Sequence, residues 1–239
     1  EVIGLLGYRP VFVDVDYDSF NVTAKNIEQA ISVKTKAIIP VHLFGQAAPM
    51  EAIMGIAKKY DLHVIEDTAQ ALGADYIYED GHKQKLGTIG TIGCTSFFPS
   101  KNLGCYGDGG AIFTNDDVLA EKMRMISNHG MKERYHHDVL GVNSRLDTIQ
   151  AAVLSAKLKH LDEYAQARNE AAKVYNEAFV EIEDLILPKQ ELFSSHVYHQ
   201  YTLKVKNGRR DELKAFLAEN NIPSMVYYPI PLHKQKAFL

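Results

Sequence analysis

Two side chains of this sequence, Lys101 and Asp67, have the chemistry of a cofactor site. Lys101 is flanked by small residues and glycines after an apolar, strand-like run, so we expect it on a turn with room for a planar ligand. Asp67 ends another such run, where its carboxylate can pair with a protonated pyridine nitrogen. A site for pyridoxal phosphate (PLP) requires a lysine that forms a Schiff base and an acid that keeps the ring an electron sink. The pair therefore indicates PLP chemistry.

Each of these residues also has a purely structural interpretation. A lone lysine is usually a solvated loop residue, and an aspartate after a strand is often the N-cap of the next helix. Ser96 favours the cofactor site, because it lies five residues before Lys101, where its hydroxyl can donate to a phosphate. The glycines within 104–110 add backbone N–H groups, which also bind phosphate.

The first half of the chain alternates between apolar runs and amphipathic segments. The predicted elements are strands at 10–15, 37–41 and 62–67 and helices at 23–32, with Thr23 as N-cap, and 48–60. This alternation implies parallel strands joined by right-handed crossovers, which is the α/β class. In such sheets ligands bind beyond the carboxyl ends of the strands, and Asp67 lies at such an end.

Beyond residue 87 the pattern changes to short strands separated by a glycine-rich loop, followed by helices. The predicted elements are strands at 93–98 and 110–114 and helices at 116–128 and from 146 to about 180. Leu154, Leu158 and Leu161 recur with heptad-like spacing, which indicates that the last of these is one long helix leaving the first domain.

A smaller second domain is predicted from a strand at 197–205 and an amphipathic helix at 210–219. We place the large, PLP-binding domain at 1–158 and the small domain at 159–239. The chain opens without an initiator Met and closes in mid-pattern, so we expect the large domain to lack its N-terminal part and the small domain to be incomplete.

The composition argues against several classes of function. With 26 basic and 30 acidic residues the net charge is −4 and no block of like charge occurs, so we expect no nucleic-acid partner. Cys94 and Cys105 are too few for a disulfide framework and fit a reducing cytosol, so we expect a cytoplasmic protein. No apolar run approaches the roughly 20 residues that span a bilayer, and we expect no membrane association.

Three stretches contain the residues discussed so far: EDTAQALGA at 66–74, SFFPSKNLG at 96–104 with GDGG at 107–110, and GVNSRLD at 141–147 with QAA at 150–152. In content and order they resemble the sugar aminotransferases of the DegT/DnrJ/StrS type, which have the fold type I aminotransferase architecture. The resemblance runs from GYRPVFVD at 7–14, through IIPVHLFGQ at 38–46, to YPIPLH at 228–233. It implies a mostly parallel central sheet flanked by helices, plus a smaller C-terminal α/β domain. The family's upstream phosphate-binding helix start would precede residue 1.

Carried over residue by residue, the resemblance implies that Lys101 binds PLP covalently and that Asp67 holds the pyridinium nitrogen. Gln70 is expected to contact the ring hydroxyl, and Ser96 to bind the cofactor phosphate. Asn143 is expected to reach the phosphate of PLP in the neighbouring subunit. The protein is therefore expected to be a homodimer with shared active sites.

The implied reaction is a two-stage amino transfer, in which an amino acid, glutamate in our interpretation, donates its amine to the cofactor and a nucleotide-linked keto-sugar receives it. Residues 104–110 and 134–138 look most like those of members that aminate C3 of a UDP-linked 3-keto-hexuronate (UDP-2-acetamido-3-keto-hexuronate) for bacterial surface polysaccharides such as the O-antigen of lipopolysaccharide. Amination at C4 of a dTDP- or UDP-linked keto-deoxysugar is the alternative. Arg145, Tyr227 and Tyr228 are expected to serve the substrate, although the two tyrosines also fit a small-domain core.

Other classes fit less well. A dinucleotide-binding oxidoreductase needs a G-x-G-x-x-G turn that opens a helix after a first strand, and the sequence has none. His63, His129 and the adjacent pair at 136–137 have poor spacing for a metal site, so no metal is expected. A related PLP-dependent sugar dehydratase replaces the lysine with histidine, whereas this chain keeps Lys101. A non-enzymatic member that senses PLP or a sugar nucleotide stays an open alternative.

Overall fold

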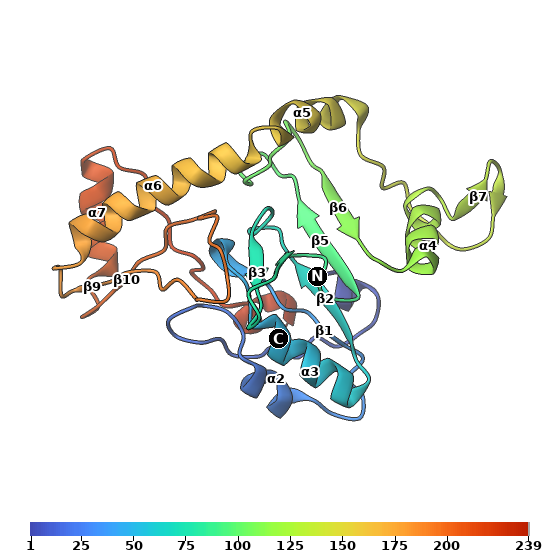
Figure 1. Cartoon of the computed structure of the whole chain (residues 1–239), viewed down its shortest axis with the longest axis horizontal. Helices are drawn as coiled ribbons and strands as arrows, with labels where there is room; N and C mark the ends of the chain where they lie inside the picture. The colour runs from blue at the N-terminus through green and yellow to red at the C-terminus, as the bar shows by residue number, and fades with distance from the viewer. Residues whose placement is uncertain (239) are drawn as a thin grey trace.

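The computed structural model describes residues 1–238 and has a four-stranded sheet at its centre (Figure 1). The strand order is β1-β2-β5-β6, made by Ala37–Ile38, His63–Asp67, Ile92–Ser96 and Gly110–Phe113. β1, β2 and β5 are parallel, and β6 runs antiparallel to β5. The predicted α/β class with a mostly parallel sheet is therefore confirmed.

The other elements surround or extend this sheet. The helices are α1 (Val2–Leu5), α2 (Ala24–Ala30), α3 (Met50–Tyr60), α4 (Asp117–Ser127), α5 (Thr148–Leu158), α6 (Leu161–Phe179) and α7 (Arg210–Glu219), with 3-10 turns η1 (Leu43–Gly45), η2 (Leu232–Lys234) and η3 (Lys236–Phe238). Three antiparallel pairs join β3 (Asp75–Ile77) to β4 (Lys83–Lys85), β7 (Met131–Glu133) to β8 (His136–His137) and β9 (Leu185–Ile186) to β10 (Lys204–Val205). In Figure 1, α4 and β7 lie on one side of the sheet, and α6 and α7 extend on the other.

The first crossover, from β1 through α3 to β2, follows from local sequence signals. α3 places Ile53, Ile56 and Ala57 on one buried face, as their helical spacing predicts. The helix ends at Asp61, which takes a left-handed conformation with φ 53°. Ile53 packs in the same core cluster as Val64 of β2, and both side chains are fully buried. Each such burial contributes about 1.5–3 kcal/mol. β2, and Asp67 at its end, are therefore firmly positioned.

The strand predicted at 10–15 is wrong. This segment makes a single β-bridge, between Val15 and Val22, and the side chain of Val11 is exposed. Its apolar residues pack elsewhere: the ring of Phe12 meets that of Phe238 edge-on, with centroids 5.2 Å apart. An apolar run alone does not distinguish a sheet strand from an extended segment that packs by its side chains.

The long helix predicted from 146 to about 180 is wrong in its continuity, because Lys159 and His160 separate α5 from α6. Leu154 of α5 is buried in a cluster against which Leu161 of α6 also packs, while Leu158 is more than half exposed. The break between the helices lets Leu161 pack against this cluster. The heptad-like spacing of the leucines does not reveal such a break. It falls at the predicted boundary between residues 158 and 159, and the division into two domains stays a prediction.

The strand predicted at 197–205 is also wrong over most of its length, since only β10 is formed. The backbone before it bends at Tyr198, where φ is 41°, and the N–H of Val197 donates to the carbonyl oxygen of Gly45 at 2.9 Å. Val197 is thereby buried in the cluster that contains Val64. The predicted second domain ends at Leu239, which lies outside the described residues. Among residues 1–238, no helix combines the length and apolar character needed to cross a bilayer.

Candidate active site

Asp67 and Lys101 lie at the carboxyl ends of neighbouring parallel strands. Asp67 is the last residue of β2, and Lys101 lies on a turn five residues after the end of β5. Burial lowers the pKa of the Lys101 amine, and the negative charge of Asp67 opposes this shift in part. The structure therefore brings the two predicted residues to the same edge of the sheet and within electrostatic reach of each other. Their roles stay predictions.

The carboxylate of Asp67 is held by its own backbone. Its Oδ1 accepts a hydrogen bond from the N–H of Ala69 at 2.9 Å, which leaves Oδ2 for a ligand. The residues after it form turns and not an α-helix, so Asp67 is not a helix N-cap. The simplest structural alternative for this residue is therefore wrong.

A buried, hydrogen-bonded pair of side chains that the sequence did not reveal, His42 and Glu66, lies next to Asp67 in the structure. Glu66 is fully buried and accepts three backbone N–H groups of the 87–90 turn, at 2.6 to 2.8 Å, and Nε2 of His42 at 3.0 Å. Nδ1 of His42 accepts the N–H of Ala48 at 3.0 Å, so Nε2 carries the hydrogen and donates. Burial raises the pKa of Glu66, but these hydrogen bonds outweigh it and the pKa is lowered. The N–H of His42 also donates to the Asp67 carbonyl oxygen at 3.0 Å, which ties the pair to Asp67.

Gln70 and Tyr228, both predicted for the site, are joined by a hydrogen bond. Gln70 Oε1 accepts the N–H of Phe44 at 2.7 Å, and its Nε2 donates to the Tyr228 hydroxyl at 3.3 Å. The second hydrogen on Nε2 is available to a ligand. Tyr227 turns elsewhere, because its hydroxyl lies 3.7 Å from the sulfur of Met225. The structure thus favours Tyr228 over Tyr227 as a site residue.

Ser96 ends β5, and its hydroxyl oxygen accepts the N–H of Phe98 at 3.2 Å, so the hydroxyl hydrogen is free to donate. Asn143 and Arg145 lie on an exposed segment, where Nε of Arg145 donates to Oδ1 of Asn143 at 3.2 Å. Within residues 1–238 no hydrogen bond joins this segment to Lys101. That is compatible with a role in a neighbouring subunit, which stays a prediction.

The loop around Lys101 is fastened on two sides by residues that the sequence did not single out. Asn102 is buried, and its Nδ2 donates to the carbonyl oxygen of Val197 at 3.1 Å. Further along, the N–H of Tyr106 donates to Oε1 of Gln150 at 2.8 Å, and Nζ of Lys157 donates to the carbonyl oxygen of Gly104. Gln150 and Lys157 belong to α5, so this helix and the 197–199 segment together hold the loop.

Two histidines near this loop are neutral at pH 7. Burial lowers the pKa of His196 to about 4. Burial also lowers the pKa of His199 to about 4, with smaller contributions from the charges of Lys101 and Arg168. His196 is stacked on the ring of Tyr198, with centroids 3.8 Å apart, and its Nδ1 accepts the Tyr198 N–H at 3.0 Å.

We expect acid to destabilise the protein as the pH falls from about 6.5 to about 4, because an unfolded histidine binds a proton at pH 6.5 and folded His196 does so only at about 4. The unfolded state therefore binds more protons in this window. His196→Asn keeps an acceptor for the Tyr198 N–H but removes the titration. We expect it to reduce the loss in free energy of unfolding by about 3 kcal/mol. Urea unfolding across the pH range measures this.

The matched control for this prediction is His63→Asn, which removes an exposed imidazole at the start of β2. Because His63 is exposed, this variant shows how the loss of a histidine outside the core changes the free energy of unfolding. A His196→Asn variant that loses as much stability as the wild type between these pH values would contradict the assignment.

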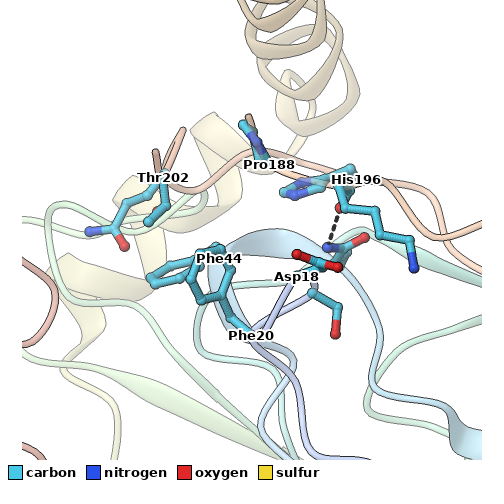
Figure 2. A pocket seen from close by; sticks show the side chains of 10 residues that line it. Asp18, Phe20, Phe44, Pro188, His196 and Thr202 are labelled. Atoms are coloured by element: carbon cyan, nitrogen blue, oxygen red, sulfur yellow. Dashed lines mark hydrogen bonds between the residues drawn. The ribbon is translucent and has the colours of Figure 1, made fainter. Parts of the chain in front are cut away.

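A small cavity lies beside His196. Figure 2 shows its wall, in which Phe20 and Phe44 lie below Pro188, His196 and Thr202. Its volume of about 10 Å³ is room for one water molecule at most. None of the predicted site residues lines it. It is therefore too small and wrongly placed for a planar cofactor.

Comparison with known proteins gives consistent matches over the whole chain. The model of the DegT/DnrJ/EryC1/StrS aminotransferase family matches residues 1–239. A pleiotropic regulatory protein of Geobacillus stearothermophilus is 52% identical over 238 residues, 99% of this chain and 62% of that protein. A UDP-2-acetamido-2-deoxy-3-oxo-D-glucuronate aminotransferase of Pseudomonas aeruginosa is 47% identical over 237 residues, 99% of this chain and 64% of that protein.

Among solved structures, DesV of S. venezuelae in complex with a ketimine intermediate superposes with a TM-score of 0.93 at 38% identity. The match covers 99% of this chain and 62% of DesV. The chain thus spans just under two thirds of the length of the relatives that it matches.

Proposed function

The chain belongs to the DegT/DnrJ/EryC1/StrS aminotransferase family, and on that premise we propose that the protein is a PLP-dependent aminotransferase of nucleotide-linked keto-sugars. The family and the fold type I architecture expected from the sequence are confirmed by the family match and by the superposition on DesV. The observation that carries the proposal is the placement of Lys101 and Asp67 at the ends of adjacent parallel strands, with the charge of Asp67 acting on the lysine.

The residues at this edge fit PLP, the cofactor of the family. Asp67 offers a carboxylate oxygen for the ring nitrogen, Ser96 a free hydroxyl hydrogen for the phosphate, and Gln70 an amide hydrogen for the ring hydroxyl. Lys101 offers the amine that attaches the cofactor. When bound, PLP would supply an electron sink for the substrate carbon and would carry the amino group from one substrate to the next.

Within this mechanism Lys101 has two tasks, and both require a neutral amine. Nζ would hold the cofactor, and as a free amine it would accept and return a proton at the substrate carbon. Burial, which lowers its pKa, favours the neutral form. The carboxylate of Asp67 holds the proton on the ring nitrogen. The His42–Glu66 pair next to it fixes the strand end in one position.

We propose that the acceptor is a UDP-linked 3-keto-hexuronate aminated at C3, with glutamate as donor and surface-polysaccharide assembly in the cytoplasm as setting. The P. aeruginosa relative, named for a 3-oxo-glucuronate substrate, supports this choice. Amination at C4 of a dTDP- or UDP-linked keto-deoxysugar is the competing proposal. In a homodimer, Asn143 and Arg145 would enter the neighbouring site from their exposed segment.

A second candidate function is that of a PLP-binding or sugar-nucleotide-binding sensor without turnover. The relative from G. stearothermophilus, named a regulatory protein, favours it. The retention of Lys101 and the edge geometry of Asp67 favour the enzyme.

An absorption titration separates the two functions. Purified protein with PLP should show the visible band of the lysine-bound cofactor, and glutamate should bleach this band because the amine displaces Lys101 and stays on the cofactor. A band that persists with saturating glutamate would support the sensor. Mass spectrometry of products from a panel of UDP- and dTDP-linked keto-sugars then identifies the carbon that is aminated.

A further inference from the structure

The turn that carries Lys101 is tied to a distant part of the chain by Asn102. Its Nδ2 donates to the carbonyl oxygen of Val197 at 3.1 Å, and its Oδ1 lies 3.1 Å from Nδ1 of His199. These contacts cross 95 and 97 positions of sequence. Because the amide donates through Nδ2, Oδ1 must accept, and Nδ1 of His199 must carry the hydrogen. The two side chains therefore fix each other's orientation.

This assignment leaves Nε2 of His199 as an unprotonated acceptor, and within residues 1–238 it has no hydrogen-bond partner. His199 is close enough to Lys101 for the charge of the lysine to act on its ring. A neutral ring adds no like charge next to the amine, whereas a cation in this position would repel the amine when it is protonated.

The backbone around His199 is held as well as its side chain. Arg168 of α6 donates to the carbonyl oxygens of Tyr198 and His199 at 2.9 and 3.2 Å. The backbone nitrogens of both residues also approach Gly45, where an added Cβ would lie 2.8 and 3.0 Å from them. His199 is therefore a fixed support and not a mobile loop side chain.

We propose that Asn102 and His199 form a positioning pair that holds the Lys101 turn where its amine meets the cofactor, an inference that rests on the function proposed above. Asn102 is bonded to Lys101 through one peptide, and the N–H of Lys101 donates to the Phe98 carbonyl oxygen at 2.8 Å, which closes the turn. Loss of either member of the pair frees one end of this turn while the ligands for the ring and the phosphate stay in place. The cofactor is then still bound but attached less often.

The test measures the fraction of bound cofactor that is attached to Lys101, which a loss of stability alone does not change. Holoprotein is reduced with borohydride, the labelled Lys101 peptide is quantified by mass spectrometry, and total cofactor is measured in parallel. In Asn102→Leu and His199→Phe we expect the attached fraction to fall at least about twofold, and single-turnover amine transfer from glutamate to slow about tenfold or more. His199→Asn, in which an amide can still donate to Asn102, should retain most of both.

The matched control is Asn21→Leu. Asn21 is also buried and also donates to main-chain carbonyls, those of Gln46 at 3.4 Å and Ala47 at 3.2 Å, but not in the Lys101 turn. This variant should lose stability and keep the attached fraction. An unchanged attached fraction in both Asn102→Leu and His199→Phe would overturn the pair's role. If the wild type itself traps no cofactor on Lys101, the proposed function fails, and the role of the pair fails with it.

Discussion

Replacement of Lys101 by alanine is expected to lower kcat by at least about 10⁴-fold, because the variant loses both the attachment of the cofactor and the proton transfer at the substrate carbon. The amine is partly buried at the edge of the sheet, and no second lysine is present in the 96–110 region to replace it. Steady-state turnover of a keto-sugar nucleotide with glutamate, using the full-length protein, measures the loss.

A second variant, Lys101→Arg, separates the positive charge of the side chain from its ability to lose a proton. Its guanidinium keeps the positive charge but does not deprotonate in proteins, so it can neither attach the cofactor nor accept a proton. We therefore expect Lys101→Arg to be as inactive as Lys101→Ala. Lys58→Ala, on the exposed face of α3, is the control and should leave turnover unchanged. Near-wild-type turnover by Lys101→Ala would end the assignment, and substantial turnover by Lys101→Arg would show that only a charge is needed at this position.

Asp67→Asn is expected to lower kcat about 10²- to 10³-fold with little change in stability, the size of effect that follows from removing one preorganised electrostatic partner. The amide oxygen can still accept the N–H of Ala69, so the turn after β2 is preserved. What is lost is the negative charge that stabilises a proton on the ring nitrogen. kcat and thermal unfolding should be measured on the same preparation.

Asp61→Asn is the matched control for this change. Asp61 has a left-handed backbone at the end of α3, a conformation that asparagine adopts readily, and it lies on the connection that leads into β2. It should keep wild-type turnover. If Asp67→Asn retained full kcat, Asp67 would be a structural residue of the turn and the ring nitrogen would need another partner.

The elements that the sequence predicted well are those whose signals are local. Thr23 caps α2 with its side chain, the apolar spacing of α3 is borne out, and α7 has the predicted bounds of 210–219. The wrong predictions at 10–15 and 197–205 concern apolar segments that form little or no regular strand structure. Val197 is buried without regular strand hydrogen bonding, whereas Val11 and Val15 are apolar but exposed. Both cases give the same apolar pattern as a strand, so the sequence could not separate them from one.

The residues of the candidate site also fall into those that the sequence suggests and those that only the structure reveals. Lys101 and Asp67 could be proposed from the sequence because each has a distinctive chemistry and lies at or after the end of a strand. The supporting contacts could not, because they depend on tertiary structure: His42 meets Glu66 from 24 positions away, and Asn102 meets Val197 from 95 positions away. A histidine or an asparagine in a loop carries no signal of such a partner. Glu66, the acid next to Asp67, was the one hint of a buried partner in the sequence. A buried strand rarely ends on two acids unless one of them is paired.

Helix α5 has a position that couples two parts of the chain. Gln150 and Lys157 bind the loop that follows Lys101, and the helix begins directly after the exposed segment that contains Asn143 and Arg145. A ligand or second chain that contacts this segment would act on the loop through α5. If the docking of residues 143–147 and the binding of cofactor at Lys101 are coupled in this way, each would change the affinity of the other by the same factor. Cofactor binding and dimer assembly would then be thermodynamically linked.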